Sequence, residues 1–195
     1  MSEQFKALIL DLVSKQVKDI SNVNFSHPNS KIKDVLLSND ILIKEETNVL
    51  KVLFDKYDSD KCVLHNYNYL YAVLFTKIKY TSKHIMEVGT YKGASLRSWK
   101  EYFINADIYG IDIDPDTVFE EQRIHTMIAD QNIMESMNEV NRKWPQGYDV
   151  VIDDGWHQPE ASVYTMIAFI PQLKKGGIYI LEDIDQKYRI FYENL

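Results

Sequence analysis

Acidic side chains stand at the ends of five short apolar segments in the second half of this 195-residue chain. These acids are Glu87, Asp112 with Asp114, Asp130, Asp153 with Asp154, and Glu182 with Asp183. If the segments are parallel strands of one sheet, their carboxyl ends share one rim, and ligands of open α/β sheets bind at that rim. Carboxylates crowded together repel one another, so a purely structural sheet has no need of them. We therefore expect the rim to bind a cation, a ligand rich in hydroxyls and amines, or both.

The first strand-to-helix turn contains Gly89 and Gly93, which suit a close approach between a ligand and the backbone. The third glycine of the dinucleotide fingerprint is missing, which argues against a pyrophosphate cradle. Glu87 could pair with a cationic amine, Asp112 could accept both hydroxyls of a ribose, and Asp130 could accept from an adenine amine. Together these groups suit S-adenosylmethionine better than NAD. Taken alone, the turn could equally be a tight connection without a ligand.

A second cluster combines Asp154 with Glu182 and Asp183, from strand ends that we expect to be neighbours. Three carboxylates without a sulfur ligand suit a hard cation such as Mg²⁺. Such a cation could hold a substrate hydroxyl and lower its pKa, and His157, three residues beyond Asp154, could take the proton. Each acidic pair alone is more often a turn or a solvated strand exit, and a single histidine is more often structural. Their convergence favours a catalytic site in which Asp154 and His157 act.

The elements that must position these groups follow from the hydrophobic pattern, which changes near residue 82. Before that point we expect a helix that includes Phe5 and Leu8, a loop over 21–40, and helices over 45–57 and 67–77. After it, the expected strands are 84–88, 108–112, 124–129, 148–153 and 178–181, with helices between them. Alternating strands and helices predict an α/β fold with a parallel sheet. We thus divide the chain into a helical N-terminal region, 1–82, and a core, 83–195.

Composition narrows the class of protein further. A net charge of -7 and a pI of about 5.2 disfavour general binding to nucleic acid, which requires a basic face. No apolar run approaches the ~20 residues of a membrane span, and the first residues do not form a secretory signal. The single cysteine, Cys62, excludes an internal disulfide. We expect a cytoplasmic protein without nucleic-acid partners.

Several motifs follow one another in a fixed order along the chain. They are GASLRSW at 93–99, YGIDIDP at 109–115, Asp130-Gln131, IDDGWH at 152–157, Gly176-Gly177 and Glu182-Asp183. This ordered set resembles class I S-adenosylmethionine-dependent O-methyltransferases, specifically the metal-dependent macrocin and mycinamicin sugar type. The segment KYDSDK at 56–61, followed by His65, Tyr67 and Tyr71, is similar to the stretch ahead of the core in those enzymes. The resemblance covers roughly residues 55–184.

The resemblance implies Mg²⁺-assisted transfer of a methyl group from S-adenosylmethionine to a sugar hydroxyl of a glycan or a glycosylated natural product. It assigns the cofactor to Glu87, Gly89, Thr90, Tyr91, Gly93, Ser95, Asp112, Asp130, Gln131 and Asp153, and to Tyr57, Lys61 and His65 of a lid segment over 55–71. It assigns Mg²⁺, or another hard divalent cation, to Asp154, Glu182 and Asp183, and makes His157 the general base. For the lid, the alternative is a helical capping module in which Tyr67 and Tyr71 pack at i and i+4.

The resemblance also implies a Rossmann-like sheet in the strand order 3-2-1-4-5. The full sheet of this class has seven strands, the last two forming a hairpin. Residues 184–195 after Asp183 are too few for a helix and that hairpin, so we expect the last two strands to be absent and the edge to be open or covered by a partner. Trp156 stands where the family commonly has Ser, which could reshape the acceptor pocket. Asp58 replaces the usual Gly of the preceding stretch.

Two other functions compete with the methyltransferase hypothesis. A shortened sheet would also suit an S-adenosylmethionine-binding module or subunit without independent catalysis. An NAD-dependent or nucleotide-sugar enzyme would use a similar sheet, although the absent third glycine argues against it. The sequence does not name the acceptor, which we expect to be a small molecule or a glycan, and it leaves a homo-oligomer open.

Overall fold

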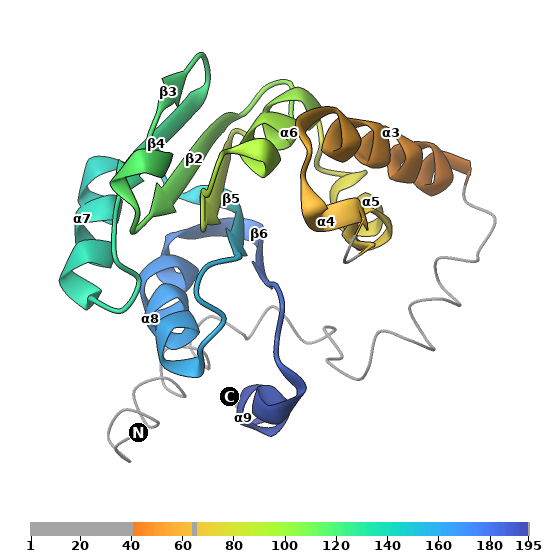
Figure 1. Cartoon of the computed structure of the whole chain (residues 1–195). Helices are drawn as coiled ribbons and strands as arrows, with labels where there is room; N and C mark the ends of the chain where they lie inside the picture. Colours follow the sequence, from red (N-terminus) through yellow and green to blue (C-terminus); the bar gives the residue numbers. More distant parts are fainter. Residues whose placement is uncertain (1–40, 64–65, 195) are drawn as a thin grey trace.

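The structure, a computed structural model, describes residues 41–63 and 66–194 (Figure 1). Within these residues a mostly parallel sheet lies between two layers of helices. The helix predicted around Phe5, the loop predicted over 21–40 and His65 lie outside the described residues.

The sheet has the strand order β3-β4-β2-β1-β5-β6. Its strands are β1 (His84–Val88), β2 (Asp107–Asp112), β3 (Glu120–Glu121), β4 (Ile124–Ile128), β5 (Tyr148–Asp153) and β6 (Leu173–Leu181). All neighbouring pairs are parallel except β3 and β4, which are antiparallel. Without β3, this is the predicted order 3-2-1-4-5, so the predicted α/β fold is confirmed. The two-residue β3 is an addition, because two residues are too few to show a strand period.

The last strand begins earlier than predicted. The expected strand covers 178–181, but β6 already pairs with β5 at Leu173 and Tyr148. The register then shifts, so that Ile178 pairs with Val150. Gly176, at φ 79°, lies in the intervening irregularity. An irregular strand of this kind lacks the strict alternation from which strands are predicted.

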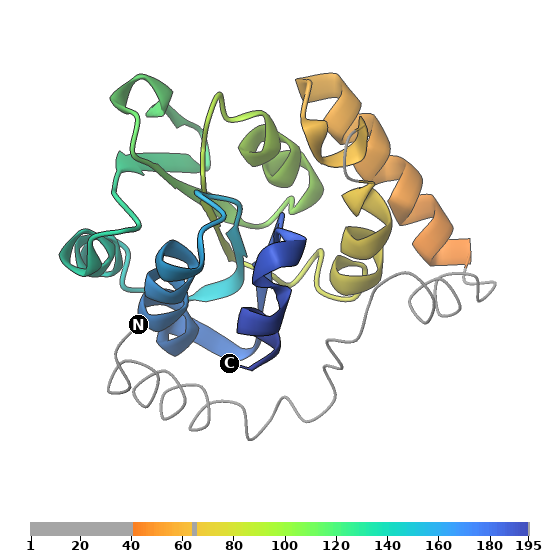
Figure 2. The same cartoon turned by 60° about the horizontal axis from the view of Figure 1, so that its bottom comes forward.

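Helices cover both faces of the sheet (Figures 1 and 2). They are α3 (Ile41–Tyr57), α4 (Asp60–Val63), α5 (Tyr67–Phe75), α6 (Ala94–Tyr102), α7 (Met134–Lys143), α8 (Pro159–Phe169) and α9 (Arg189–Glu193). One apolar cluster joins Ile85 and Ile108 to α3, α5 and α6, and a second joins Met86 and Val151 to α7 and α8. The central strands are therefore apolar on both sides, as expected for a parallel sheet.

Trp99 links the helices that precede the sheet to the sheet itself. Its ring contacts Phe54 of α3 and both Tyr71 and Phe75 of α5, with ring centroids 5.2, 4.9 and 5.8 Å apart. Its Nε1 donates a 3.1 Å hydrogen bond to Glu87 of β1. The side chain is completely buried, so α3 and α5 are held to the core by one shared aromatic cluster.

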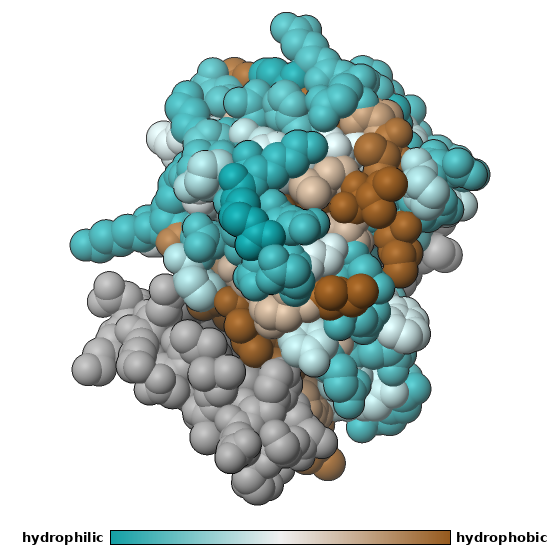
Figure 3. Space-filling model, turned by 90° about the vertical axis from the view of Figure 1, so that its left-hand side faces the viewer, coloured by the Kyte–Doolittle hydropathy of each residue, from teal (hydrophilic) through white to brown (hydrophobic). Residues whose placement is uncertain are grey.

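The face in Figure 3 is hydrophilic over most of its area, with hydrophobic residues gathered in limited bands. Among the described residues, no helix combines the length and the apolar character that a membrane span requires. Several large apolar side chains that stay exposed, including Tyr91, Ile113 and Trp156, line one cavity. Their exposure therefore belongs to the candidate site rather than to the general surface.

Replacing Trp99 with Ala should lower the free energy of unfolding by about 3–5 kcal/mol, because it removes a fully buried aromatic side chain. Urea denaturation followed by circular dichroism measures this loss. Trp99→Phe keeps one aromatic ring in the cluster and removes the hydrogen bond to Glu87. Its free energy of unfolding should therefore fall by less than that of Trp99→Ala. An unchanged urea midpoint in Trp99→Ala would show that this cluster does not hold the helices to the core.

Candidate functional site

A cavity of about 630 Å³ opens beyond the carboxyl ends of the strands. Its wall is formed by the turns that follow β1, β2, β4, β5 and β6, together with the segment between α3 and α4. The predicted site residues that line it are Lys61, Gly89, Thr90, Tyr91, Ser95, Asp112, Asp130, Gln131, Asp154, His157 and Asp183. Residues far apart in the sequence thus meet at one rim of the sheet.

Gly89 allows the turns after β1 and β5 to touch. Its φ of 93° lies in the left-handed region, and a Cβ at this position would lie 2.1 Å from the carbonyl oxygen of Asp154. The same turn places the backbone N–H of Tyr91 2.7 Å from Oδ2 of Asp112. Only glycine meets both the conformational and the steric requirement. The turn after β1 therefore connects the predicted cofactor residues to the predicted catalytic residues.

Asp112 and Asp130 line the cavity with carboxylates that the backbone holds in place. Asp112 accepts from Tyr91 through Oδ2 and from the backbone N–H of Asp114 through Oδ1, at 3.0 Å. Asp130 accepts through Oδ1 from the backbone N–H and the side-chain amide of Asn132, at 2.8 and 3.0 Å. Each ionised carboxylate has about four acceptor sites, so both retain capacity for a ligand.

Gln131 supports the loop that carries His157. Its Oε1 accepts a 2.6 Å hydrogen bond from the backbone N–H of Trp156, and its Nε2 donates to Thr165 Oγ1 at 3.2 Å. A Cβ on Gly155 would lie 2.0 Å from the same Oε1. The loop after β5 is therefore shaped around the Gln131 amide, whatever further role Gln131 has toward a ligand.

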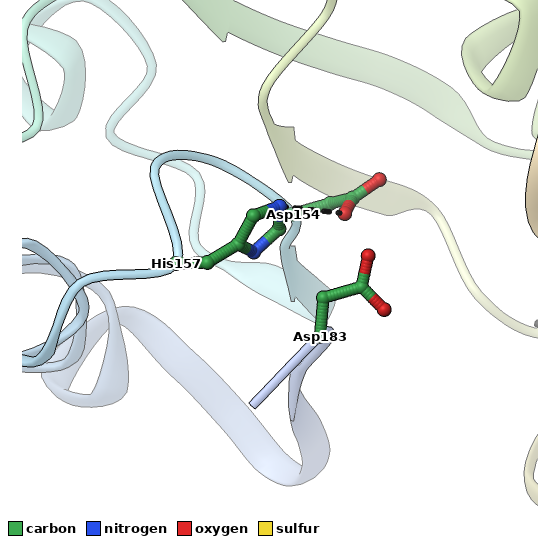
Figure 4. A group of neighbouring side chains, drawn as sticks. All are labelled: Asp154, His157 and Asp183. Atoms are coloured by element: carbon green, nitrogen blue, oxygen red, sulfur yellow. Dashed lines mark ion pairs between the residues drawn. The ribbon is translucent and has the colours of Figure 1, made fainter. Parts of the chain in front are cut away.

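Three side chains converge at the mouth of the cavity (Figure 4). Asp154, His157 and Asp183 each offer one ligand atom, and these atoms lie within 4.8 Å of one another. The His157 Nε2 atom is 3.9 Å from Oδ1 of Asp154, while its Nδ1 is buried and has no hydrogen-bond partner. This arrangement can hold a cation or hand a proton to the imidazole.

The backbone is strained around the same cavity. Of six non-glycine residues with positive φ in the described part of the chain, four line the cavity: Asp58, Tyr91, His157 and Asp183. Such conformations cost free energy and concentrate at functional sites. Strain at both His157 (φ 54°) and Asp183 (φ 51°) supports a functional role for the convergent group.

Lys61 is a buried cation within the acidic cluster. Its side chain is 2% exposed, and its Nζ lies 2.7 Å from Asp154 Oδ2, 2.8 Å from Glu182 Oε2 and 3.2 Å from Glu87 Oε1. Burial alone would lower the pKa of Lys61, but the three carboxylates outweigh burial and hold that pKa well above its usual range. Lys61 therefore carries its charge inside the protein.

Glu87 and Asp153, both predicted cofactor residues, are buried behind the wall of the cavity and do not line it. Glu87 accepts from Ser95 Oγ at 2.8 Å and from Trp99, and the amine that it pairs with is that of Lys61. Burial raises the pKa of Glu87, and Lys61 opposes this effect. Asp153 accepts a 2.9 Å hydrogen bond from Tyr179, and burial raises its pKa to about 6. Neither lines the cavity.

The structure brings only some of the remaining predicted residues to the cavity. Tyr57 donates to Glu101 of α6 and does not line the cavity, and Gly93 is the N-cap of α6. Glu182 is buried against Lys61 and is not part of the convergent group. Tyr67 of the predicted lid does reach the site, because its hydroxyl donates to Asp183 Oδ1 at 2.5 Å.

Among the wall residues that were not predicted as site residues are Ser59, Ile113 and Asn132. None of them is a catalytic or metal-binding type, so residue chemistry did not single them out. Their positions carried the signal, because Ile113 follows the acid at the end of β2 and Asn132 follows Asp130-Gln131.

A parallel sheet with β1 at its centre, a glycine turn after β1 and an acid after β2 are features of Rossmann-like α/β folds, in which ligands bind beyond the carboxyl ends of the strands. No family model matches the chain. A rhamnosyl tetracenomycin-C 2'-O-methyltransferase of Streptomyces olivaceus is 32% identical over 68% of this chain and 37% of that protein. Demethylmacrocin O-methyltransferase of Streptomyces fradiae is 33% identical over 64% of this chain and 33% of that protein.

Solved structures agree with these relatives. The mycinamicin-pathway methyltransferase MycE, in complex with Mg, S-adenosylhomocysteine (SAH) and mycinamicin VI, superimposes with a TM-score of 0.65 at 31% identity, over 73% of this chain and 39% of MycE. Over the region that it shares with them, the chain is similar to the macrocin and mycinamicin type of sugar O-methyltransferases. It spans about a third of the length of these curated relatives.

Replacing Gly89 with Ala should destabilise the protein far more than replacing Gly176 with Ala. Both glycines have positive φ, but nothing lies within 4 Å of a Cβ at Gly176, whereas a Cβ at Gly89 overlaps the Asp154 backbone. The left-handed backbone alone costs a residue other than glycine about 1–2 kcal/mol, which is the expected loss for Gly176→Ala in urea denaturation. Equal losses in the two variants would contradict the close contact between the turns after β1 and β5.

Proposed function

We propose that this chain binds S-adenosylmethionine in the cavity and catalyses Mg²⁺-assisted methylation of a sugar hydroxyl. The observation that carries the proposal is the convergence of Asp154, His157 and Asp183 at the mouth of a cavity lined by the turns after β1, β2 and β4. The similarity to sugar O-methyltransferases supports the same reaction class. The acceptor we propose is a glycan or a glycosylated natural product.

The cavity suits the cofactor in size and in chemistry. Its volume of about 630 Å³ falls within the ~300–1,000 Å³ of small-molecule sites. Asp112 is placed to accept from ribose hydroxyls and Asp130 from the adenine amine, while Gly89 permits close backbone approach. Thr90 contributes a buried hydroxyl that has no hydrogen-bond partner and can serve a ligand. When bound, S-adenosylmethionine would supply an electrophilic methyl group.

The convergent group suits a divalent cation. Asp154 and Asp183 provide the carboxylate oxygens that Mg²⁺ prefers, and His157 lies beside them, where it can act on an acceptor rather than hold the metal. Glu182, the third acid of the predicted set, is adjacent in sequence but is held by Lys61. A bound metal would lower the pKa of an acceptor hydroxyl.

His157 is the proposed general base. Its imidazole is about one-third exposed, at 34%, so an acceptor entering from solvent can reach it. Asp154 lies beside the ring and Gln131 fixes the loop, so the imidazole is oriented before the acceptor arrives. Trp156, 61% exposed on the cavity wall, adds a flat apolar surface beside the base. We propose that it contacts the acceptor.

Several finer predictions from the sequence stay predictions. These are the boundary near residue 82, the lid role of 55–71, a cytoplasmic location, a role in polysaccharide biosynthesis and a homo-oligomeric state. The cofactor roles of Glu87, Asp153 and Tyr57 would be indirect, because their contacts lie within the protein.

His157→Asn should reduce methyl transfer by about 10²-fold or more, because it removes the proposed base. Asn tolerates the left-handed backbone at this position, so the loop should keep its shape. Transfer of labelled methyl from S-adenosylmethionine to mycinamicin VI and to a panel of rhamnosides measures the loss, while calorimetry should show unchanged SAH affinity. His125→Asn, on the exposed surface of β4, is the matched control. Near-normal transfer by His157→Asn would exclude this base.

Removing the metal should separate cofactor binding from catalysis. SAH should bind with similar affinity in Mg²⁺ and in EDTA, because Asp112 and Asp130 need no metal, whereas methyl transfer should be lost in EDTA. Asp183→Asn, also tolerated at positive φ, should weaken Mn²⁺ binding. Absence of SAH binding in both buffers would overturn the proposed cofactor. SAH binding without transfer to any acceptor would favour a binding module.

A further inference from the structure

The Lys61 ammonium is enclosed by carboxylates, hydrogen bonds to two of them, Asp154 and Glu182, and lies within ion-pair distance of a third, Glu87. A lysine ammonium has three N–H donors, and here three carboxylates surround it, those of Asp154, Glu182 and Glu87. The positive charge of Lys61 is therefore directed at the acidic cluster. Lys61 lies on α4, ahead of the sheet, yet its contacts are with residues at the ends of β1, β5 and β6.

Two of these carboxylates are the acids predicted to bind a divalent cation. Lys61 lies 2.7 Å from Asp154 and 2.8 Å from Glu182, so the ammonium already neutralises part of the acidic cluster. The ammonium contacts Oδ2 of Asp154, whereas Oδ1 of the same carboxylate lies near His157. A metal that approaches this cluster therefore meets carboxylates that already have a cation.

Resting on the function proposed above, we propose that Lys61 is a positioning residue that competes with the divalent cation for Asp154 and Glu182. The ammonium repels a second cation, and this repulsion is only weakly screened because the side chain is buried. The same contacts stabilise the fold, since they bring a positive charge to the buried carboxylates of Glu87 and Glu182. Lys61 thus stabilises the protein while lowering its affinity for the metal.

A purely structural lysine would behave differently on replacement. If Lys61 only supported the site, its loss would disorder Asp154 and weaken metal binding. If it competes, its loss makes Asp154 and Glu182 available and strengthens metal binding. The sign of the change in affinity therefore separates the two roles, and methyl transfer need not be measured.

The experiment is titration with Mn²⁺ alone, in which electron paramagnetic resonance reports the free ion. Lys61→Met should bind Mn²⁺ on the order of tenfold more tightly than the wild-type chain, because one neighbouring positive charge is gone. Lys61→Arg keeps the charge and should restore nearly wild-type affinity. If Lys61→Met does not fold, the double variant Lys61→Met/Glu87→Gln removes the buried charge that would be left unpaired, and it should also bind more tightly.

Lys79→Met is the matched control, because Lys79 is another buried lysine with an acidic partner. Its Nζ lies 2.9 Å from Glu46, and neither residue lines the cavity. This variant should lose stability without any change in Mn²⁺ affinity. Unchanged or weaker Mn²⁺ binding by folded Lys61→Met and by the double variant would overturn the competition. If neither the wild-type chain nor any variant binds Mn²⁺, the proposed metal site itself fails, and the competition fails with it.

Discussion

Crowded carboxylates at one rim of the sheet require a counter-charge, and much of this structure is arranged around that requirement. Glu87, Asp154 and Glu182 end neighbouring strands, and their mutual repulsion would oppose folding if nothing balanced it. The buried Lys61 ammonium, which comes from a helix ahead of the sheet, provides the compensating positive charge. Because α4 carries this lysine, the helices before the sheet must pack against the strand ends. Trp99 strengthens this packing, since its ring contacts α3 and α5 and its Nε1 donates to the same Glu87.

The site is assembled mainly by contacts between turns. Gly89 permits the turn after β1 to touch the backbone of Asp154, and Gln131 from the turn after β4 holds Trp156. Each turn depends on its neighbour, so His157 and Asp183 can be kept in left-handed conformations that isolated turns would avoid. The functional groups are thereby held in place before any ligand binds.

The strand order divides the proposed work. β1 lies between β2 and β5, so the cavity spans the point where the order of the strands reverses. The turns after β1, β2 and β4 provide the walls that suit a nucleoside. The turns after β5 and β6 provide the side chains proposed to bind a cation and to accept a proton. This division matches a reaction in which one molecule donates a group and a second accepts it.

The sequence by itself determined the five parallel strands and the acids that follow them, because strands that alternate with helices favour a parallel sheet. The order of the strands followed from the resemblance to known methyltransferases. The sequence also identified Gly89, whose type is required by the local turn. Tertiary structure alone decided which acids face the cavity: Glu87, Asp153 and Glu182 turn inward, whereas Asp112, Asp130 and Asp183 line it. The reason is physical, because a charged side chain is buried only where a partner compensates it, and the partners, Lys61 and Tyr179, come from distant segments.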